Sequence, residues 1–157
     1  MSKTAKRLKE MGVVLPKPAT PVANYVPSVR AGSLLFVSGQ LPLGEDGKLN
    51  ERHQGKLLAD SEVDAAREAA RLCIINVLAQ AEAALGDLDQ VKQVVRLGGF
   101  FSVETSFDAL GQAMNGASNF IVELFGEKGR HARTTIGVAH LPLNALVEVE
   151  AVFEIKV

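Results

Sequence analysis

The chain has 157 residues, 47% hydrophobic and 22% charged, which are ordinary proportions for a soluble globular protein. Its length predicts a single domain. The formal net charge is −1, with both signs spread along the sequence, so the clustered basic face that is typical of nucleic-acid binding is absent. No segment approaches the roughly 20 apolar residues of a membrane-spanning helix, which argues against a membrane protein.

Cys73 is the only cysteine, so neither an intrachain disulfide nor a multi-cysteine metal site can form. Its neighbours Leu72, Ile74 and Ile75 indicate a small core residue. No apolar run of signal-peptide length follows the basic residues near the N-terminus, and we therefore expect a cytoplasmic protein. The histidines lack metal-ligand spacing and no nucleotide-binding loop is present, so we expect neither a metal nor a cofactor.

The first 21 residues are predicted to form an N-terminal arm. Residues 1–12 suit a short amphipathic turn of helix, with Leu8 and Met11 on one side. The prolines at positions 16, 18 and 21 then exclude regular structure, because each removes a hydrogen-bond donor and favours an extended predecessor. We expect this arm to lie over a single domain formed by residues 22–157.

Hydrophobic periodicity predicts five strands and two helices within that domain. The strands are expected at residues 25–30, 33–38, 91–103, 134–138 and 147–155. The helices are expected to begin near Ser61 and Phe107 and to end before Gly86 and Gly126.

Two sequence pairs interrupt these elements. Gly98-Gly99 within the third strand indicates a bulge or a close backbone approach. Asn115-Gly116 within the second helix costs about 1 kcal/mol or more relative to alanine, so a requirement other than helix propensity is expected there.

The element order β-β-α-β-α-β-β predicts an α+β fold, a mixed β-sheet with two helices packed on one face. The opposite face is then either polar or buried against a partner. Residues 34–37 and Val152 are too apolar for a face in contact with water, so we expect an oligomer.

The stretch 129–150 carries the candidate functional site. Arg133 follows Arg130 and His131, and a guanidinium binds a carboxylate through two parallel donors. If residues 134–138 and 144–149 form a hairpin whose paired positions sum to about 281, Arg133 lies opposite Glu148. The alternative is a solvated edge strand on which Arg133 pairs with glutamates, an interaction of about 0–1 kcal/mol.

Several motifs together resemble the Rid family, the YjgF-like deaminases of reactive enamines and imines. The motifs are Asn24-Tyr25-Val26, Phe36-Val37-Ser38-Gly39-Gln40-Leu41-Pro42, Ala132-Arg133-Thr134, Leu141-Pro142 and Val147-Glu148-Val149-Glu150-Ala151. The resemblance covers the chain from about Tyr25 to Val157. The Ser-Gly-Gln-Leu-Pro stretch is a weak signal alone, but its combination with the arginine and glutamate motifs is specific.

The resemblance implies a chorismate-mutase-like (YjgF-like) fold in a homotrimer, with the sheets forming an inner barrel and ligand clefts at the subunit interfaces. It implies that Arg133 holds a substrate carboxylate and that Glu148 positions or activates water. The remaining pocket positions are matched by Tyr25, Ser38, Gly39, Asn115 and Thr135. Thr135 stands where many deaminases have cysteine, and only its backbone N–H is expected to bind.

Further departures are the long N-terminal arm and the Gly-Arg-His-Ala-Arg run. Together with the Asn-Gly-Ala-Ser segment, they indicate a long-chain branch whose substrate need not be that of other members. His131 either lines the mouth of the cleft or is an ordinary surface histidine. Glu150 and Glu154 are expected to be structural.

Three functions follow from these residues. The first is cofactor-independent hydrolysis of 2-aminoacrylate-like enamine and imine acids to 2-keto acids and ammonia. The second is a trimer that binds a small carboxylate or metabolite without turnover. The third, RNA cleavage or translation inhibition, is opposed by the net charge of −1 and the absence of a basic stripe.

Overall fold

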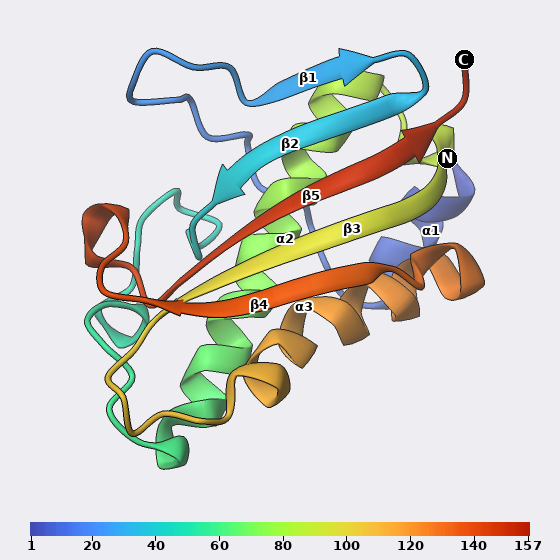
Figure 1. Ribbon diagram of the computed structural model, residues 1–157. Coiled ribbons are helices and arrows are strands. Elements are labelled where there is room, and N and C mark those ends of the chain that lie inside the picture. Colours follow the sequence, from blue (N-terminus) through green and yellow to red (C-terminus); the bar gives the residue numbers. More distant parts are fainter.

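The computed structural model describes residues 1–157 and contains one five-stranded sheet with three α-helices (Figure 1). The strands are β1 (Ser28–Ala31), β2 (Leu34–Gln40), β3 (Val91–Ser102), β4 (Ala132–Val138) and β5 (Val147–Ile155). The helices are α1 (Lys3–Glu10), α2 (Val63–Leu85) and α3 (Leu110–Phe125). The predicted α+β class with a mixed sheet is confirmed: α2 and α3 are the two helices predicted for the domain, and α1 is the turn of helix expected within residues 1–12.

The sheet order is β1-β2-β5-β3-β4, with β3 and β4 parallel and every other pair antiparallel. The parallel pair arises because α3 returns the chain to the starting end of β3, so that β4 runs in the same direction. β5 occupies the centre between β2 and β3. The hairpin considered for residues 134–138 and 144–149 therefore does not form, because β3 separates β4 from β5.

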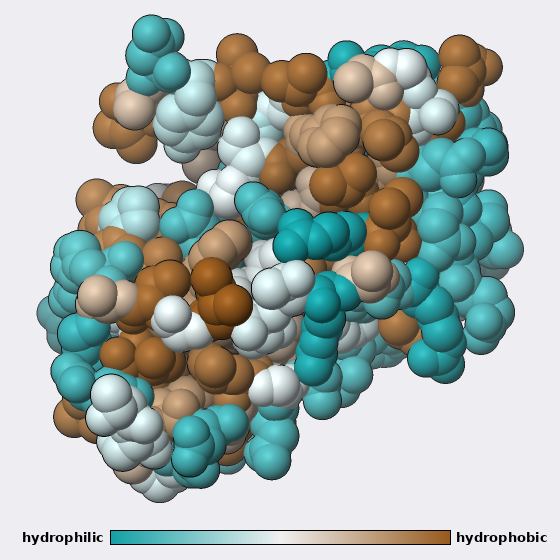
Figure 2. All heavy atoms as spheres, viewed as in Figure 1, coloured by the Kyte–Doolittle hydropathy of each residue, from teal (hydrophilic) through white to brown (hydrophobic).

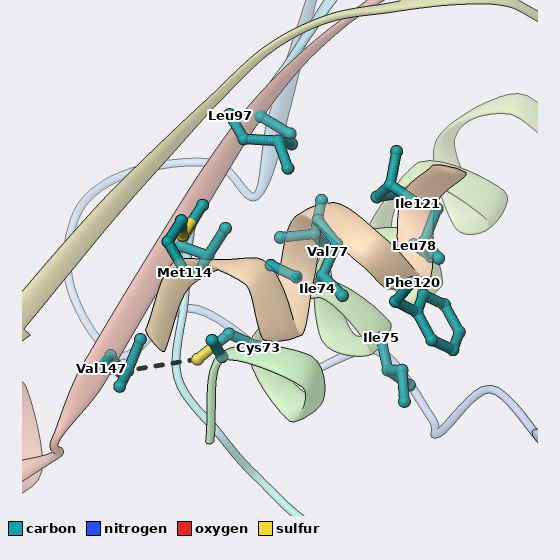
Figure 3. Close-up of a cluster of buried hydrophobic side chains, with 14 of the residues drawn as sticks. Cys73, Ile74, Ile75, Val77, Leu78, Leu97, Met114, Phe120, Ile121 and Val147 are labelled. Atoms are coloured by element: carbon teal, nitrogen blue, oxygen red, sulfur yellow. Dashed lines mark hydrogen bonds between the residues drawn. The ribbon is translucent and has the colours of Figure 1, made fainter. Parts of the chain in front are cut away.

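Helices α2 and α3 cover one face of the sheet and lie behind the strands in Figure 1. Along β5, alternate residues from Val147 to Ile155 are buried, whereas the residues between them are half-buried, as expected for a strand with one covered face. Cys73 is fully buried in this core, and its thiol donates to the carbonyl oxygen of Val147 (Figure 3). It is a core residue, as predicted.

The opposite face of the sheet is uncovered in the single chain, and Figure 2 looks onto it. Apolar and charged side chains alternate there. Phe36 is 44% exposed and Ile136 is 43% exposed, and the salt bridges Lys92–Glu154 and Arg96–Glu150 cross between strands β3 and β5. Partly exposed aromatic and aliphatic side chains on this face support the predicted oligomer, although the homotrimer and its inner barrel remain predictions.

The N-terminal helix α1 is capped by Asp89, a residue distant in sequence. The carboxylate of Asp89 accepts hydrogen bonds from the backbone N–H groups of Lys3 and Thr4 and from the Thr4 hydroxyl. It therefore satisfies donors that the first turn of a helix leaves free. Leu8 is only 5% exposed and joins the main hydrophobic core. No helix is both long enough and apolar enough to cross a membrane.

Two elements begin three residues later than the sequence predicts. β1 begins at Ser28 rather than at residue 25, directly after Pro27, which has no N–H to donate to a neighbouring strand. α3 begins at Leu110 rather than near Phe107. The carboxylate of Asp60 accepts from the backbone N–H groups of Asp108 and Ala109, which fixes the preceding residues as a turn.

Glycines allow α3 to pack closely against both of its neighbours. A Cβ atom on Gly116 would lie 1.9 Å from the carbonyl oxygen of Arg67 in α2, and one on Gly99 in β3 would lie 2.4 Å from the Met114 sulfur. At Gly116 the contact is with backbone, so a side chain would require the helix to move, whereas at Gly99 the flexible Met114 side chain would have to shift. Close packing explains the glycine of the Asn-Gly pair within α3. The approach of the Met114 side chain, not a bulge, explains Gly99.

Replacement of Gly116 by alanine is expected to destabilise the protein by about 1–3 kcal/mol, because the added methyl group meets the backbone of α2. Helix propensity alone would favour the substitution by about 1 kcal/mol. Chemical denaturation of the variant measures the difference.

Gly111→Ala is the matched control in the same helix. A Cβ atom there would make only an ordinary contact, 3.5 Å from Nη2 of Arg133, so its stability is expected to equal or exceed that of the unsubstituted protein. An equal loss in both variants would contradict the packing explanation.

Candidate functional site

Arg133 lies near the start of β4, and its guanidinium is held by helix α3. Nη1 donates to Oδ1 of Asn115 at 2.8 Å and to Oγ of Ser118 at 3.1 Å, and Nη2 donates to the carbonyl oxygen of Gly111 at 3.1 Å. Both terminal nitrogens are thus engaged, whereas Nε makes no hydrogen bond within the chain. Because Arg133 remains exposed, its guanidinium is fixed in orientation with donors left for a ligand.

The three acceptors, the Gly111 carbonyl, the Asn115 amide and the Ser118 hydroxyl, form one stripe on α3. Positions 111, 115 and 118 have the i, i+4, i+7 spacing that places residues on one helical face. Sequence motifs identify Asn115 but neither Gly111 nor Ser118. Helical spacing from Asn115 is the signal that could have found them.

Thr135 lies two residues after Arg133 and shares its face of the edge strand β4. It is paired with Gly99 on β3, and its hydroxyl oxygen is buried without a hydrogen-bond partner. The structure therefore places Thr135 on the same face of β4 as Arg133, whose guanidinium Asn115 holds. The binding role of its backbone N–H remains a prediction.

Glu148 and Gly39 form a second group on the uncovered face of the sheet. A Cβ atom on Gly39 would lie 2.0 Å from Oε1 of Glu148, so the carboxylate occupies the space that the glycine leaves open. The pairing of β2 with β5 shifts register between Val37 and Gln40, which marks a β-bulge at Ser38 and Gly39. Bulges of this kind redirect backbone and side chains and are frequent beside active sites.

Ser38 connects this second group to the loop before β1. Its hydroxyl donates to the carbonyl oxygen of Val26 at 2.8 Å, and its backbone N–H donates to the carbonyl oxygen of Pro27. Tyr25, the residue before Val26, is 51% exposed. The bulge thus anchors the loop that carries the tyrosine.

The pKa of Glu148 is raised above that of an ordinary glutamate, mainly because burial removes solvent from its carboxylate and also because the negative charge of Glu150 lies nearby. The Glu148 carboxylate forms no salt bridge with a cation. Arg96 pairs with Glu150 instead, at 3.3 Å. A raised carboxyl pKa brings proton uptake closer to neutral pH, which suits general acid–base chemistry.

Arg133 and Glu148 do not meet within one chain. Arg133 is paired with Leu97, whose partner on β5 is Ala151, so the arginine lies on the helix-covered face and Glu148 on the uncovered face. Their Cα atoms are separated by two strand spacings and three residues, roughly 14 Å. The juxtaposition that a hairpin would have produced therefore does not occur.

The solvated-edge alternative for Arg133 is also wrong, because no glutamate pairs with it. Glu150 and Glu154 pair instead with Arg96 and Lys92, the latter at 2.6 Å. Arg130 approaches Glu127 at 3.5 Å and is otherwise exposed. Among the charged residues of this region, Arg133 is therefore the one whose polar contacts are all with uncharged groups.

His131 is not an ordinary surface histidine, because both of its ring nitrogens have partners. Nδ1 lies 2.6 Å from the carbonyl oxygen of Gly129, and Nε2 lies 2.9 Å from Oγ of Ser118. The second contact connects it to the group around Arg133. His140, at the other end of β4, is exposed and makes no such contact.

Comparison with known proteins identifies the family. The model of the family described as "YjgF/chorismate mutase-like, putative endoribonuclease" matches residues 5–155. The chain belongs to this family. The resemblance drawn from the arginine, glutamate and Ser-Gly-Gln motifs is confirmed.

Individual members of the YjgF family differ in what is known of them. Protein TCP17 of Trypanosoma cruzi is 45% identical over 155 residues, which cover 98% of this chain and 95% of that protein. A crystal structure of an Agrobacterium tumefaciens protein of unknown function is 44% identical, with a TM-score of 0.86 over 98% of this chain and 92% of that one. A Dermatophagoides farinae protein named 2-iminobutanoate/2-iminopropanoate deaminase is 28% identical, covering 87% of this chain and 89% of its own.

The raised pKa of Glu148 predicts a pH-dependent gain of stability in Glu148→Gln. The folded protein binds this proton more tightly than the unfolded chain, so stability is lost as pH rises from the unfolded-state pKa to the higher folded-state pKa. The glutamine cannot ionise and escapes this loss. Its stability relative to the unsubstituted protein is therefore expected to increase across that window and stay higher at neutral pH.

Urea denaturation at several pH values between about 4 and 8 checks this expectation. Glu154→Gln is the control on the same strand and face. Because Glu154 is paired with Lys92, its replacement should leave stability unchanged or slightly lower at neutral pH. A Glu148→Gln variant that is less stable at every pH would contradict a desolvated, uncompensated carboxylate.

Proposed function

We propose that this protein hydrolyses small imine and enamine carboxylates of the 2-aminoacrylate type, forming 2-keto acids and ammonia without a cofactor. The observation that carries the proposal is the Arg133 guanidinium, held by Asn115, Ser118 and Gly111 of α3 with donors left free. A fixed and exposed guanidinium without a carboxylate partner is suited to bind a ligand carboxylate in a defined orientation.

The reaction needs only water and proton transfer. An enamine acid first tautomerises to the imine, and the oxygen of water then bonds to the imine carbon while the nitrogen is protonated. The resulting carbinolamine loses its C–N bond, and the nitrogen leaves as ammonia as the carbonyl forms. No atom is oxidised or reduced, so the proposed chemistry requires no redox cofactor.

Glu148 is proposed to manage these protons. A carboxyl group whose pKa is raised by burial and by Glu150 can accept a proton from water during attack and return it to the departing nitrogen. The space at Gly39 places this carboxyl group against the backbone of the β2 bulge. Ser38 and Tyr25 are proposed to line the same part of the pocket.

The complete site is proposed to lie between subunits. Each chain presents an arginine group on one face and a glutamate group on the other, roughly 14 Å apart, so one chain cannot apply both to one small substrate. A homotrimer repeats the same heterologous interface until the ring closes. It would then bring Arg133 of one subunit to Glu148 of the next at each interface.

The name of the deaminase relative supports this activity. Binding of a small carboxylate without turnover is the alternative that rests on the same guanidinium, and the assay below separates the two. We retain a cytoplasmic location, an arm of residues 1–21 and a domain of residues 22–157 as part of the proposal.

Arg133→Ala is expected to reduce kcat/KM for imines generated in situ from amino acids by about a hundredfold or more, since the carboxylate loses a charge-assisted bidentate partner. Release of ammonia and keto acid is the measurement. Arg130→Ala, which removes a guanidinium three residues earlier, is the control and should retain activity. Undiminished turnover in Arg133→Ala would exclude the proposed role.

Subunit complementation tests the shared site directly. Arg133→Ala and Glu148→Gln chains are each expected to be nearly inactive. Co-refolding them in equal amounts restores a site wherever Arg133 of a Glu148→Gln chain meets Glu148 of an Arg133→Ala chain. For a ring with one arginine and one glutamate donor per site, about a quarter of the sites recover. Recovery of no activity above that of the separate variants would place both residues in one chain's site or in none.

A further inference from the structure

His131 is connected to the candidate site through a continuous chain of hydrogen bonds. Its Nε2 lies 2.9 Å from Oγ of Ser118, and the same oxygen lies 3.1 Å from Nη1 of Arg133. Its Nδ1 lies 2.6 Å from the carbonyl oxygen of Gly129. The order along this chain is therefore Arg133, Ser118, His131 and the Gly129 carbonyl.

The Gly129 carbonyl determines the direction of every bond in this chain. A carbonyl oxygen only accepts, so Nδ1 of His131 must carry its proton. In the neutral ring Nε2 is then an acceptor, and the hydroxyl of Ser118 donates to it. With its proton directed to the histidine, the Ser118 oxygen presents its lone pairs to the guanidinium of Arg133, which can only donate.

The anchor of the chain is rigid. Gly129 is buried, and a Cβ atom on it would lie 2.5 Å from the carbonyl oxygen of Ile121 in α3. The turn after α3 thus packs directly on the helix backbone. The positions of His131 and Ser118 are both fixed relative to α3. The Ser118 oxygen that accepts from Arg133 therefore keeps its position relative to Asn115.

We infer that His131 is a positioning residue for carboxylate recognition: through Ser118 it holds the Arg133 guanidinium in the orientation that binds the substrate. This inference rests on the proposed function, because it assumes that Arg133 receives the carboxylate. His131 itself touches neither the ligand nor the reacting atoms. Its replacement therefore weakens ligand binding while leaving the chemical step unchanged.

The first experiment measures pyruvate binding by calorimetry, which does not depend on turnover. His131→Leu, which removes both ring nitrogens, is expected to raise the Kd about five- to tenfold, as expected for the loss of one neutral hydrogen bond. His131→Gln can still accept from Ser118 through its amide oxygen and should stay within about twofold of the unsubstituted protein. His140→Leu, at the exposed far end of β4, is the control and leaves the Kd unchanged.

A double-mutant cycle tests whether His131 acts through Ser118. If it does, Ser118→Ala with His131→Leu binds pyruvate no more weakly than Ser118→Ala alone, within about twofold. Independent, multiplying losses would overturn the connection. In turnover assays the His131→Leu effect should appear in KM with kcat retained, as for an interaction equally strong in the ground and transition states.

Nitrogen NMR of the imidazole tests the bond directions without any ligand and without any variant. The Nδ1–H tautomer is expected for neutral His131, and an Nε2–H tautomer would overturn the inference, because Ser118 could not then donate to the ring. Because no variant is needed, this measurement can overturn the inference even if His131→Leu fails to fold.

The outcomes for the two proposals are distinct. Loss of pyruvate binding in Arg133→Ala with an unchanged Kd in His131→Leu would overturn the role of His131 and leave the proposed function standing. An unchanged Kd in Arg133→Ala would overturn the proposed function itself. Equal losses in His131→Leu and His131→Gln would show that the acceptor for Ser118 is not what matters, and would also overturn the role of His131.

Discussion

The candidate site depends on the close packing of helix α3 against α2 and against the sheet. Gly116 lets the backbone of α3 approach the Arg67 carbonyl, and Gly99 lets Met114 lie directly on β3. With the helix fixed from both sides, the stripe that begins at Gly111 faces the edge strand β4. Core packing thus determines the position of the acceptors that hold Arg133. The backbone contact at Gly116 cannot adjust on its own, because a closely packed interior transmits displacements.

The sheet order is the second constraint, and it separates the functional groups. Insertion of β3 between β4 and β5 places the guanidinium of Arg133 on the covered face and the carboxyl of Glu148 on the uncovered face. Each half is chemically incomplete: the cation has only neutral partners, and the carboxyl is desolvated beside Glu150 without a compensating cation. Association of identical chains could satisfy both halves at once. In such an assembly, the partly exposed Phe36 and Ile136 would supply apolar contact on the uncovered face.

Local sequence patterns predict much of this arrangement. The features that they do not predict share one cause. Period-two alternation located β5, and helical periodicity with Gly86 and Gly126 located the ends of α2 and α3. The family motifs pointed to Arg133 and Glu148. β4 and β5 are neighbours in sequence but do not pair, because β4 pairs with β3, a strand that precedes it by a whole helix. The capping of α1 by Asp89 and the engagement of His131 by Ser118 likewise join residues far apart in sequence or on different elements.

The sequence by itself determined the α+β class, the approximate positions of the helices and strands, the family and the identity of the candidate arginine and glutamate. These follow from side-chain periodicity and from motifs, which are properties of neighbouring residues. Only the tertiary structure decided which element lies beside which, and therefore that Arg133 is held by α3, that Glu148 fills the space at Gly39, and that the two lie on opposite faces. Those relations depend on non-local packing, where the absence of a side chain at Gly39, Gly99 or Gly116 matters only once another element is placed against it.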